Sequence, residues 1–117
     1  MTLPNGGKGQ VRVPPEPVLI VGGREIPLTG ETLVIGREGD IEIPDKEKWV
    51  SKEHVKSYRD KVGQYWIEDM GSVNGTFVYQ DGQYVRKNKW ALADGDVIAL
   101  CWSPGKGPYI TLKFKTS

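Results

Sequence analysis

The hydrophobic residues of this chain occur in short runs that turn-forming residues separate. Some runs are continuously apolar, as in residues 18–21, and others alternate with polar residues, as in residues 40–43. Both patterns are typical of β-strands. Because the runs recur about every ten residues, the chain is predicted to be an all-β sandwich of about ten short strands. The predicted strands are residues 18–21, 25–28, 32–35, 40–43, 54–59, 64–68, 76–79, 83–86, 97–102 and 109–115.

Residues 45–55 are the one segment whose composition, rich in Lys and Glu, favours a helix. The segment follows directly on Pro44, and its apolar residues do not recur every three or four positions. We therefore predict a loop with a helical turn there. Asp81-Gly82, by contrast, predicts a tight hairpin, since both central residues of such a turn must tolerate positive φ. Asp94-Gly95 marks a second corner of this kind.

The composition agrees with this pattern and suggests a boundary. The chain has 117 residues, with 15 Gly and 8 Pro, which disfavours long helices. Residues 1–17 hold four of the prolines and few apolar residues, so they are predicted to be a flexible lead or linker before one domain at residues 18–117. No apolar run reaches the roughly 20 residues of a transmembrane helix, and residues 1–10 lack the apolar stretch of a signal peptide.

The charged residues and the single cysteine exclude several functions. Sixteen Lys and Arg against 15 Asp and Glu leave a net charge of +1, which disfavours broad capture of nucleic acid or an acidic membrane. One histidine and one cysteine exclude the usual zinc sites, and no metal or other cofactor is predicted. Cys101 cannot form an internal disulfide, which points to the cytoplasm. We expect it to be a buried, small apolar residue.

Three polar segments stand at the ends of predicted strands: Gly36-Arg37, residues 51–54 (Ser-Lys-Glu-His) and residues 71–76 (Gly-Ser-Val-Asn-Gly-Thr). Loops at one end of a sandwich bring together side chains from distant parts of the sequence. We therefore expect these segments to share one surface.

The side chains on these segments are suited to phosphate recognition. The guanidinium of Arg37 binds tetrahedral oxygens two at a time, Ser51 supplies a hydroxyl donor and Lys52 a mobile positive charge. Asn74 offers two amide donors and a carbonyl acceptor. The sequence alone also allows Ser51 and His54 to be a nucleophile and its base. We prefer a buried structural His54 hydrogen-bonded to a loop backbone, because no Gly-x-Ser-x-Gly elbow or second histidine is present.

Other motifs have structural interpretations as well. Asn74-Gly75-Thr76 is formally a glycosylation sequon, but it is also a good turn before a strand, and Thr76 is predicted to be a structural strand residue. The basic residues 86–89 are read as a solvated strand end rather than a nucleic-acid patch. Of the four tryptophans, Trp49 stands out because its polar loop adjoins the expected site.

These motifs together resemble a forkhead-associated (FHA) domain. Gly36-Arg37, Ser51-x-x-His54 and Asn74-Gly75-Thr76 occur in that order on loops between strands. Residues 69–77 (Asp-Met-Gly-Ser-Val-Asn-Gly-Thr-Phe) are similar to the second signature of the family, and residues 92–98 to its late strand-turn-strand. The resemblance extends over residues 17–115 and implies about eleven strands in two packed sheets.

The resemblance also implies roles for individual residues at one apex that binds a phosphothreonine peptide. Arg37 and Ser51 would contact the phosphate, with charge added by Lys52, and Asn74 would hold the peptide backbone. His54 would orient the Ser51 loop. Gly36 and Gly75 would serve backbone geometry, and Thr76 would support the site. Val73 departs from the family, because many members carry a hydroxyl residue there; with Trp49 it is a candidate contact for peptide specificity.

The sequence therefore predicts a non-enzymatic module that recognises phosphothreonine peptides and mediates phosphorylation-dependent protein–protein interaction. Its partner would be a threonine-phosphorylated protein, with neither nucleic acid nor membrane as a ligand, and its oligomeric state stays open. Two alternatives remain. One is an interaction domain of the same fold that works independently of phosphate. The other is a small serine hydrolase using Ser51 and His54.

Overall fold

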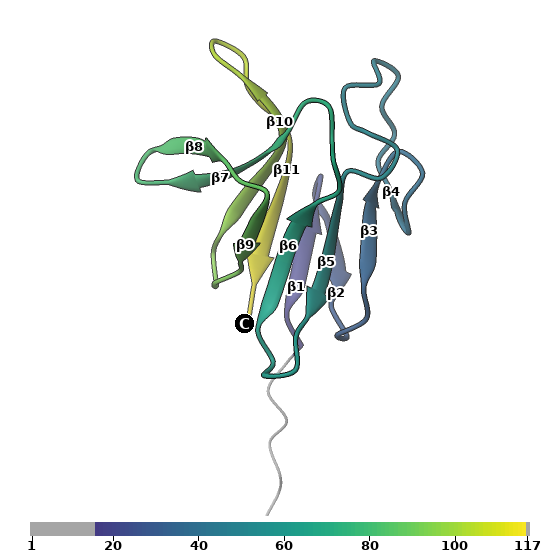
Figure 1. Cartoon of the computed structure of the whole chain (residues 1–117), viewed down its shortest axis with the longest axis vertical. Coiled ribbons are helices and arrows are strands. Elements are labelled where there is room, and N and C mark those ends of the chain that lie inside the picture. The colour runs from purple at the N-terminus through teal and green to yellow at the C-terminus, as the bar shows by residue number, and fades with distance from the viewer. Residues whose placement is uncertain (1–15, 117) are drawn as a thin grey trace, which may run out of the picture.

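A computed structural model of the chain describes residues 16–116. These residues form eleven strands and no helix, and the strands make two sheets packed as a sandwich (Figure 1). The predicted all-β sandwich is therefore confirmed. The strands are β1 (Val18–Val21), β2 (Arg24–Pro27), β3 (Leu33–Gly36), β4 (Ile41–Glu42), β5 (Val55–Arg59), β6 (Tyr65–Asp69), β7 (Thr76–Gln80), β8 (Gln83–Arg86), β9 (Lys89–Ala91), β10 (Val97–Ser103) and β11 (Gly107–Lys115).

Strands from both ends of the described chain lie side by side. The six-stranded sheet has the order β2-β1-β11-β10-β7-β8, and the five-stranded sheet has the order β4-β3-β5-β6-β9. Neighbouring strands are antiparallel, except that β3 and β4 are parallel. Val18 at the start of β1 pairs with Lys115 at the end of β11, so that the two ends of the fold are held together by a backbone ladder.

One hydrophobic core lies between the sheets. Alternation along β1 turns Leu19 and Val21 inward, whereas β10 is buried continuously from Ile98 to Cys101. The removal of these side chains from water is the main free-energy gain that holds the two sheets together. Other core residues are Leu28, Ile35, Ile43, Val50, Val55, Tyr65, Ile67, Val78, Leu92, Leu112 and Phe114.

Most of the predicted turns and strands are confirmed. The ten predicted strands match observed ones to within two residues at each end. Asp81 and Gly82 both have positive φ, 48° and 83°, as the two-residue hairpin between β7 and β8 requires. Residues 43–54 form a long loop without a helix, in agreement with the prediction for most of that segment.

The hydrophobic pattern missed one strand, β9. We expected residues 86–89 to be a solvated strand end, and Arg86 does end β8, but Lys89 begins β9 beside β6. β9 is the edge strand of the five-stranded sheet. The ammonium of Lys89 on this strand lies 4.7 Å from the ring centroid of Trp66 on β6, which is a cation–π contact. A three-residue strand is too short to show a period of two in its sequence.

The connections that carry the candidate residues lie at one end of the sandwich. The loops that follow β3, β4 and β6 meet there, and the β10–β11 hairpin projects beside them (Figure 1). The predicted lead, residues 1–17, lies almost wholly outside the described residues. Within those described residues there is also no helix long and apolar enough to cross a membrane.

Candidate functional site

Backbone hydrogen bonds join the Arg37 segment to the Ser51 segment. The N–H of Arg37 donates to the carbonyl of Ser51 at 3.1 Å, and the N–H of Glu38 donates to the carbonyl of Lys52 at 2.9 Å. These two bonds bring together residues that are fourteen positions apart in the sequence. The guanidinium, hydroxyl and ammonium groups therefore extend from adjoining stretches of backbone.

Gly36 makes this close approach possible. A Cβ at this position would lie 2.3 Å from the carbonyl oxygen of Lys52 and 2.7 Å from that of Ser51. Such distances are far below van der Waals contact, and both atoms belong to the backbone, which cannot rotate away. A larger residue would separate the two segments.

The guanidinium of Arg37 is oriented by the loop that it faces. Its Nε donates to the carbonyl oxygen of Val50 at 2.6 Å, and the side chain is half-buried. Neither terminal nitrogen hydrogen-bonds to another of residues 16–116. An arginine held through Nε still presents its two-pronged face to an anion, which is the arrangement that suits phosphate oxygens.

Ser51 and Lys52 complete the cationic side of the site. The Ser51 hydroxyl oxygen accepts a hydrogen bond from the N–H of Val73 at 3.2 Å, so its hydrogen stays available for an acceptor. The ammonium of Lys52 lies 3.8 Å from the carboxylate of Glu38, and about two thirds of the Lys52 side chain is exposed. Val73 is itself 82% exposed, so its side chain is accessible to a bound peptide.

His54 is fully buried and connects two loops through backbone groups. Its Nδ1 accepts from the N–H of Ser51 at 3.1 Å, so Nε2 carries the hydrogen and donates to the carbonyl of Gly75 at 2.8 Å. Burial lowers the pKa of this imidazole below its usual value, although the bond to Gly75 opposes the shift. His54 contacts Ser51 through the backbone N–H rather than the hydroxyl, so the two do not form a nucleophile–base pair.

Hydrogen bonds to the carboxylate of Asp69 fix the loop that carries Asn74. Asp69 accepts hydrogen bonds from the N–H groups of Gly71 and Ser72 and from the hydroxyls of Ser72 and Thr76. Burial acts to raise the pKa of the Asp69 carboxyl, but these bonds outweigh it and the pKa lies below its ordinary value. Thr76 is thus a buried structural residue. Gly75 has a φ of 86°, which a side chain rarely tolerates.

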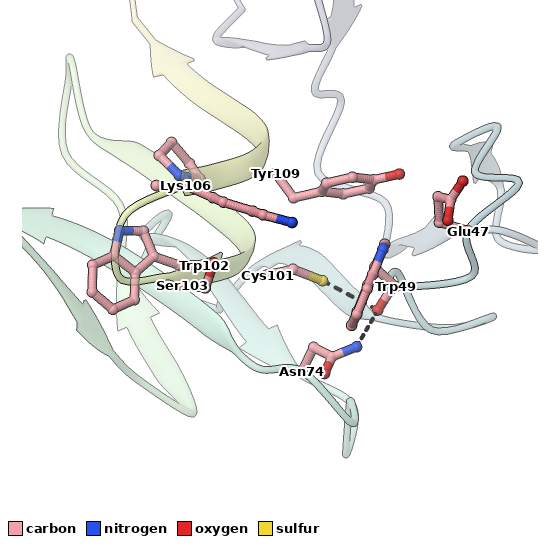
Figure 2. A pocket seen from close by; sticks show the side chains of 10 residues that line it. Glu47, Trp49, Asn74, Cys101, Trp102, Ser103, Lys106 and Tyr109 are labelled. Atoms are coloured by element: carbon pink, nitrogen blue, oxygen red, sulfur yellow. Dashed lines mark hydrogen bonds between the residues drawn. The ribbon is translucent and has the colours of Figure 1, made fainter.

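Asn74 and Cys101 both bind the main chain of Trp49. The Nδ2 of Asn74 donates to the Trp49 carbonyl oxygen at 2.8 Å, and the Cys101 thiol donates to the same oxygen at 3.2 Å (Figure 2). Burial, and after it the charge of Asp45, raises the pKa of the Cys101 thiol to about 11, so it stays protonated at neutral pH. Cys101 is buried, as predicted. It anchors the loop that carries Trp49.

An open cavity of about 530 Å³ adjoins Asn74. The β10–β11 hairpin forms one wall and the Trp49 loop the other (Figure 2). Its lining is mostly apolar, with the Trp49 ring half exposed, and Glu47 and Lys106 supply opposite charges. It is lined by Glu47, Trp49, Asn74, Cys101, Trp102, Ser103, Lys106, Gly107, Pro108 and Tyr109.

Several groups that shape this surface are not marked by any sequence motif. Val50 and Trp49 act here through carbonyl oxygens, which every residue possesses. Trp49 is a sequence candidate for peptide specificity, but nothing in the sequence marks the role of its carbonyl or that of Val50. Asp45 fixes the intervening loop by accepting from the Val50 N–H at 2.8 Å and from the Tyr109 hydroxyl. The Asp directly after Pro44, at the start of a polar loop, is the one signal that could have suggested a turn-capping role.

Comparison with known families agrees with this architecture. The model of the FHA domain family matches residues 33–101, a span that contains Arg37, Ser51, Lys52, His54 and Asn74. The chain therefore belongs to the FHA domain family. FHA domains are interaction modules, and the resemblance noted from the sequence motifs is confirmed.

Individual proteins that resemble this chain share about a third of its residues or fewer in the aligned region. An oxoglutarate dehydrogenase inhibitor of Corynebacterium jeikeium (strain K411) is 35% identical over 78 residues, which are 67% of this chain but 51% of that protein. The chain thus spans about half the length of this curated relative. The solved FHA domain of FhaA, in complex with the intracellular domain of Rv3910, is 27% identical with a TM-score of 0.67, covering 86% of this chain and all of that one.

A third relative was solved with a ligand of the expected kind. Mycobacterium tuberculosis EmbR, in complex with a low-affinity phosphopeptide, is 28% identical with a TM-score of 0.66. The match covers 86% of this chain and 24% of the EmbR chain. These similarities establish the FHA fold of the described chain.

Proposed function

We propose that this domain binds threonine-phosphorylated segments of partner proteins and so mediates phosphorylation-dependent protein–protein interaction. In this proposal Arg37, Ser51 and Lys52 hold the phosphate, and Asn74 holds the peptide backbone beside it. The domain acts by binding alone and catalyses no reaction. The observation that carries the proposal is the pair of backbone hydrogen bonds that puts Arg37 against Ser51 and Lys52 within a family match spanning all three.

The charges and donors fit the ligand. A phosphothreonine brings about −1.5 to −2 charges and three acceptor oxygens. Arg37 offers two terminal nitrogens, Ser51 a hydroxyl hydrogen and Lys52 an ammonium. Charge-assisted hydrogen bonds contribute roughly 1.5–3 kcal/mol each, so two or three of them suffice to separate a phosphorylated peptide from the unmodified one. The phosphopeptide bound to EmbR supports the same class of ligand.

Peptide residues that flank the phosphothreonine would lie on the surface next to Asn74. Because the cavity there is mostly apolar and the Trp49 ring is half exposed, it suits an apolar side chain of the peptide. Val73, which is exposed and directly precedes Asn74, is the second candidate contact. Gly36, His54, Gly75 and Thr76 act in this proposal by fixing the loops rather than by touching the peptide.

Isothermal titration calorimetry with three matched peptides tests the proposal. Peptides that differ only in carrying phosphothreonine, phosphoserine or threonine are titrated into the domain, and only the first is expected to bind tightly. Arg37→Ala is expected to weaken phosphothreonine binding by about 2–5 kcal/mol, at least about 30-fold, because one partner of a desolvated charge pair is lost.

The matched control is Arg24→Ala, which removes an arginine on β2 that hydrogen-bonds to the Glu42 carbonyl and to none of the proposed phosphate ligands, and it should leave the affinity unchanged. Equal binding of all three peptides would instead establish a phosphate-independent interaction domain of the same fold. Labelling of Ser51 by a serine-directed covalent probe would point to the hydrolase alternative.

A further inference from the structure

An acidic side chain stands at the mouth of the proposed phosphate site. The carboxylate of Glu38 lies 3.8 Å from the ammonium of Lys52, and this is the one ion pair between side chains within residues 16–116. Both side chains are mostly exposed, 65% for Lys52 and 62% for Glu38. One of the two cations assigned to phosphate is thus already paired with a carboxylate.

The backbone holds Glu38 in this place. Its N–H donates to the carbonyl oxygen of Lys52 at 2.9 Å, in the same pair of bonds that brings Arg37 to Ser51. Any conformation that assembles the cationic site therefore also sets a carboxylate beside it. The wider segment is acidic too, because residues 36–53 contain six acidic and four basic residues although the whole chain has a net charge of +1.

A bound phosphate would change the partners of both side chains. Exposed ion pairs are weak and are screened by salt, so a phosphate of nearly two charges displaces Glu38 from Lys52. The Glu38 carboxylate would then lie without a cation and next to a dianion. A positive charge carried by the peptide itself is the natural replacement, whereas a negative charge would be repelled twice, by Glu38 and by the phosphate.

We propose that Glu38 selects phosphothreonine peptides that carry lysine or arginine next to the phosphothreonine. Binding exchanges the Glu38–Lys52 pair for two new pairs, phosphate with Lys52 and the basic peptide residue with Glu38. This inference rests on the proposed function, because it concerns which phosphopeptides the same site prefers. It makes Glu38 a specificity-determining residue that is absent from the motifs of the family resemblance.

The test measures the dissociation constants of three phosphothreonine peptides that carry arginine, glutamine or glutamate on both sides of the phosphothreonine. At low salt the unsubstituted domain should bind the arginine peptide about tenfold more tightly than the glutamate peptide. Glu38→Gln should reduce this ratio to about threefold, and it should bind the glutamine peptide about threefold more tightly than the unsubstituted domain does, because Lys52 is released. Both effects should shrink in 0.5 M salt, where the Debye length is roughly 4 Å.

Glu31→Gln is the matched control, since it makes the same charge change in the exposed loop before β3, at the opposite end of the sandwich (Figure 1). If Glu38→Gln and Glu31→Gln give the same three dissociation constants, the inference is overturned. A ratio between the arginine and glutamate peptides that stays at about tenfold in Glu38→Gln overturns it as well, while leaving phosphothreonine binding established. Failure of the unsubstituted domain to bind any of the three peptides overturns the proposed function itself.

Discussion

His54 shows how one residue can support a site without touching its ligand. Both ring nitrogens are hydrogen-bonded, one to the N–H of Ser51 and one to the carbonyl of Gly75, and the side chain has no exposed surface. The first bond fixes the residue proposed to contact phosphate, and the second fixes the turn that carries Asn74. A single neutral imidazole thereby aligns the two loops.

This arrangement predicts a pH dependence of stability. Because burial lowers the pKa of His54 in the folded state, the unfolded chain binds a proton near pH 6.5 that the folded chain does not. The free energy of unfolding should therefore be constant above about pH 7 and fall by up to about 1.4 kcal/mol per unit as the pH decreases below 6.5. Urea unfolding at pH 7.5, 6.5 and 5.5 measures this.

His54→Gln provides the comparison, since His54 is the only histidine in the chain. This variant should be less stable at every pH and should lack the decrease between pH 7.5 and 5.5. The lowered pKa of the Asp69 carboxyl affects stability only at lower pH, through and below its ordinary value of 3.8. An equal slope in both proteins would contradict the assignment of the slope to His54.

At the residue scale the sequence predicted side-chain chemistry well and backbone chemistry poorly. Arg37, Ser51 and Lys52 could be selected because guanidinium, hydroxyl and ammonium groups are distinctive, and the structure brings their segments together. The carbonyl groups of Trp49 and Val50 could not be selected, because main-chain oxygens are common to all residues. The ion pair of Glu38 with Lys52 was missed since it depends on two segments meeting.

At the scale of elements, the loop between β4 and β5 is held as a unit by one carboxylate. Asp45 accepts hydrogen bonds from the N–H groups of Glu47 and Val50, and from the hydroxyl of Tyr109 on β11. This last bond, with burial as a lesser cause, raises the pKa of the Tyr109 phenol to about 12. The β10–β11 hairpin is thereby connected to the loop whose Val50 carbonyl orients Arg37.

Tyr109→Phe should loosen that loop without disturbing the core. We expect faster hydrogen exchange of the Val50 amide, because Asp45 loses a donor that fixes its orientation. Phosphothreonine affinity should fall only a few fold, since Arg37 and Ser51 remain in place. Tyr79→Phe is the matched control, as Tyr79 is an exposed tyrosine on β7. Identical exchange of the Val50 amide in both variants would show that the Tyr109 bond contributes nothing to the loop.

Elements were predicted to the extent that they were long enough to show a pattern. Strands such as β1 and β10 could be recognised from continuous apolar runs, and the Asp81-Gly82 turn from its need for positive φ. β9 could not be recognised, because pairing with β6 rather than its own sequence makes it a strand. Cys101 likewise has a φ of 69° within β10, a feature that no sequence rule assigns to a cysteine.

At the scale of the whole molecule, the fold closes on itself within the described residues. β1 pairs over its whole length with the last four residues of β11, and Leu19 and Phe114 from these two strands are both buried in the core. Leu19 is the first buried side chain in this ladder, and the ladder begins at Val18. We therefore propose that the domain begins near residue 18. The family match at residues 33–101 lies well inside that boundary.

A chain that begins at Glu16 tests the boundary. If residues 1–15 contribute nothing to the fold or the site, this truncated chain should melt within a few degrees of the full chain and bind the same phosphothreonine peptide with the same dissociation constant. Circular dichroism and calorimetry measure the two quantities. A marked loss of stability or affinity on truncation would place functional residues before Glu16 and move the boundary.

Local information in the sequence determined the class of fold, the positions of most strands and the chemistry available to the site. Strand periodicity, turn dipeptides and distinctive side chains depend on neighbouring residues, so they can be recognised without coordinates. Only the tertiary structure decided that Glu38 pairs with Lys52 and that Asp45 binds Tyr109. Such contacts depend on the distances between loops, which packing of the two sheets sets and no local sequence pattern encodes.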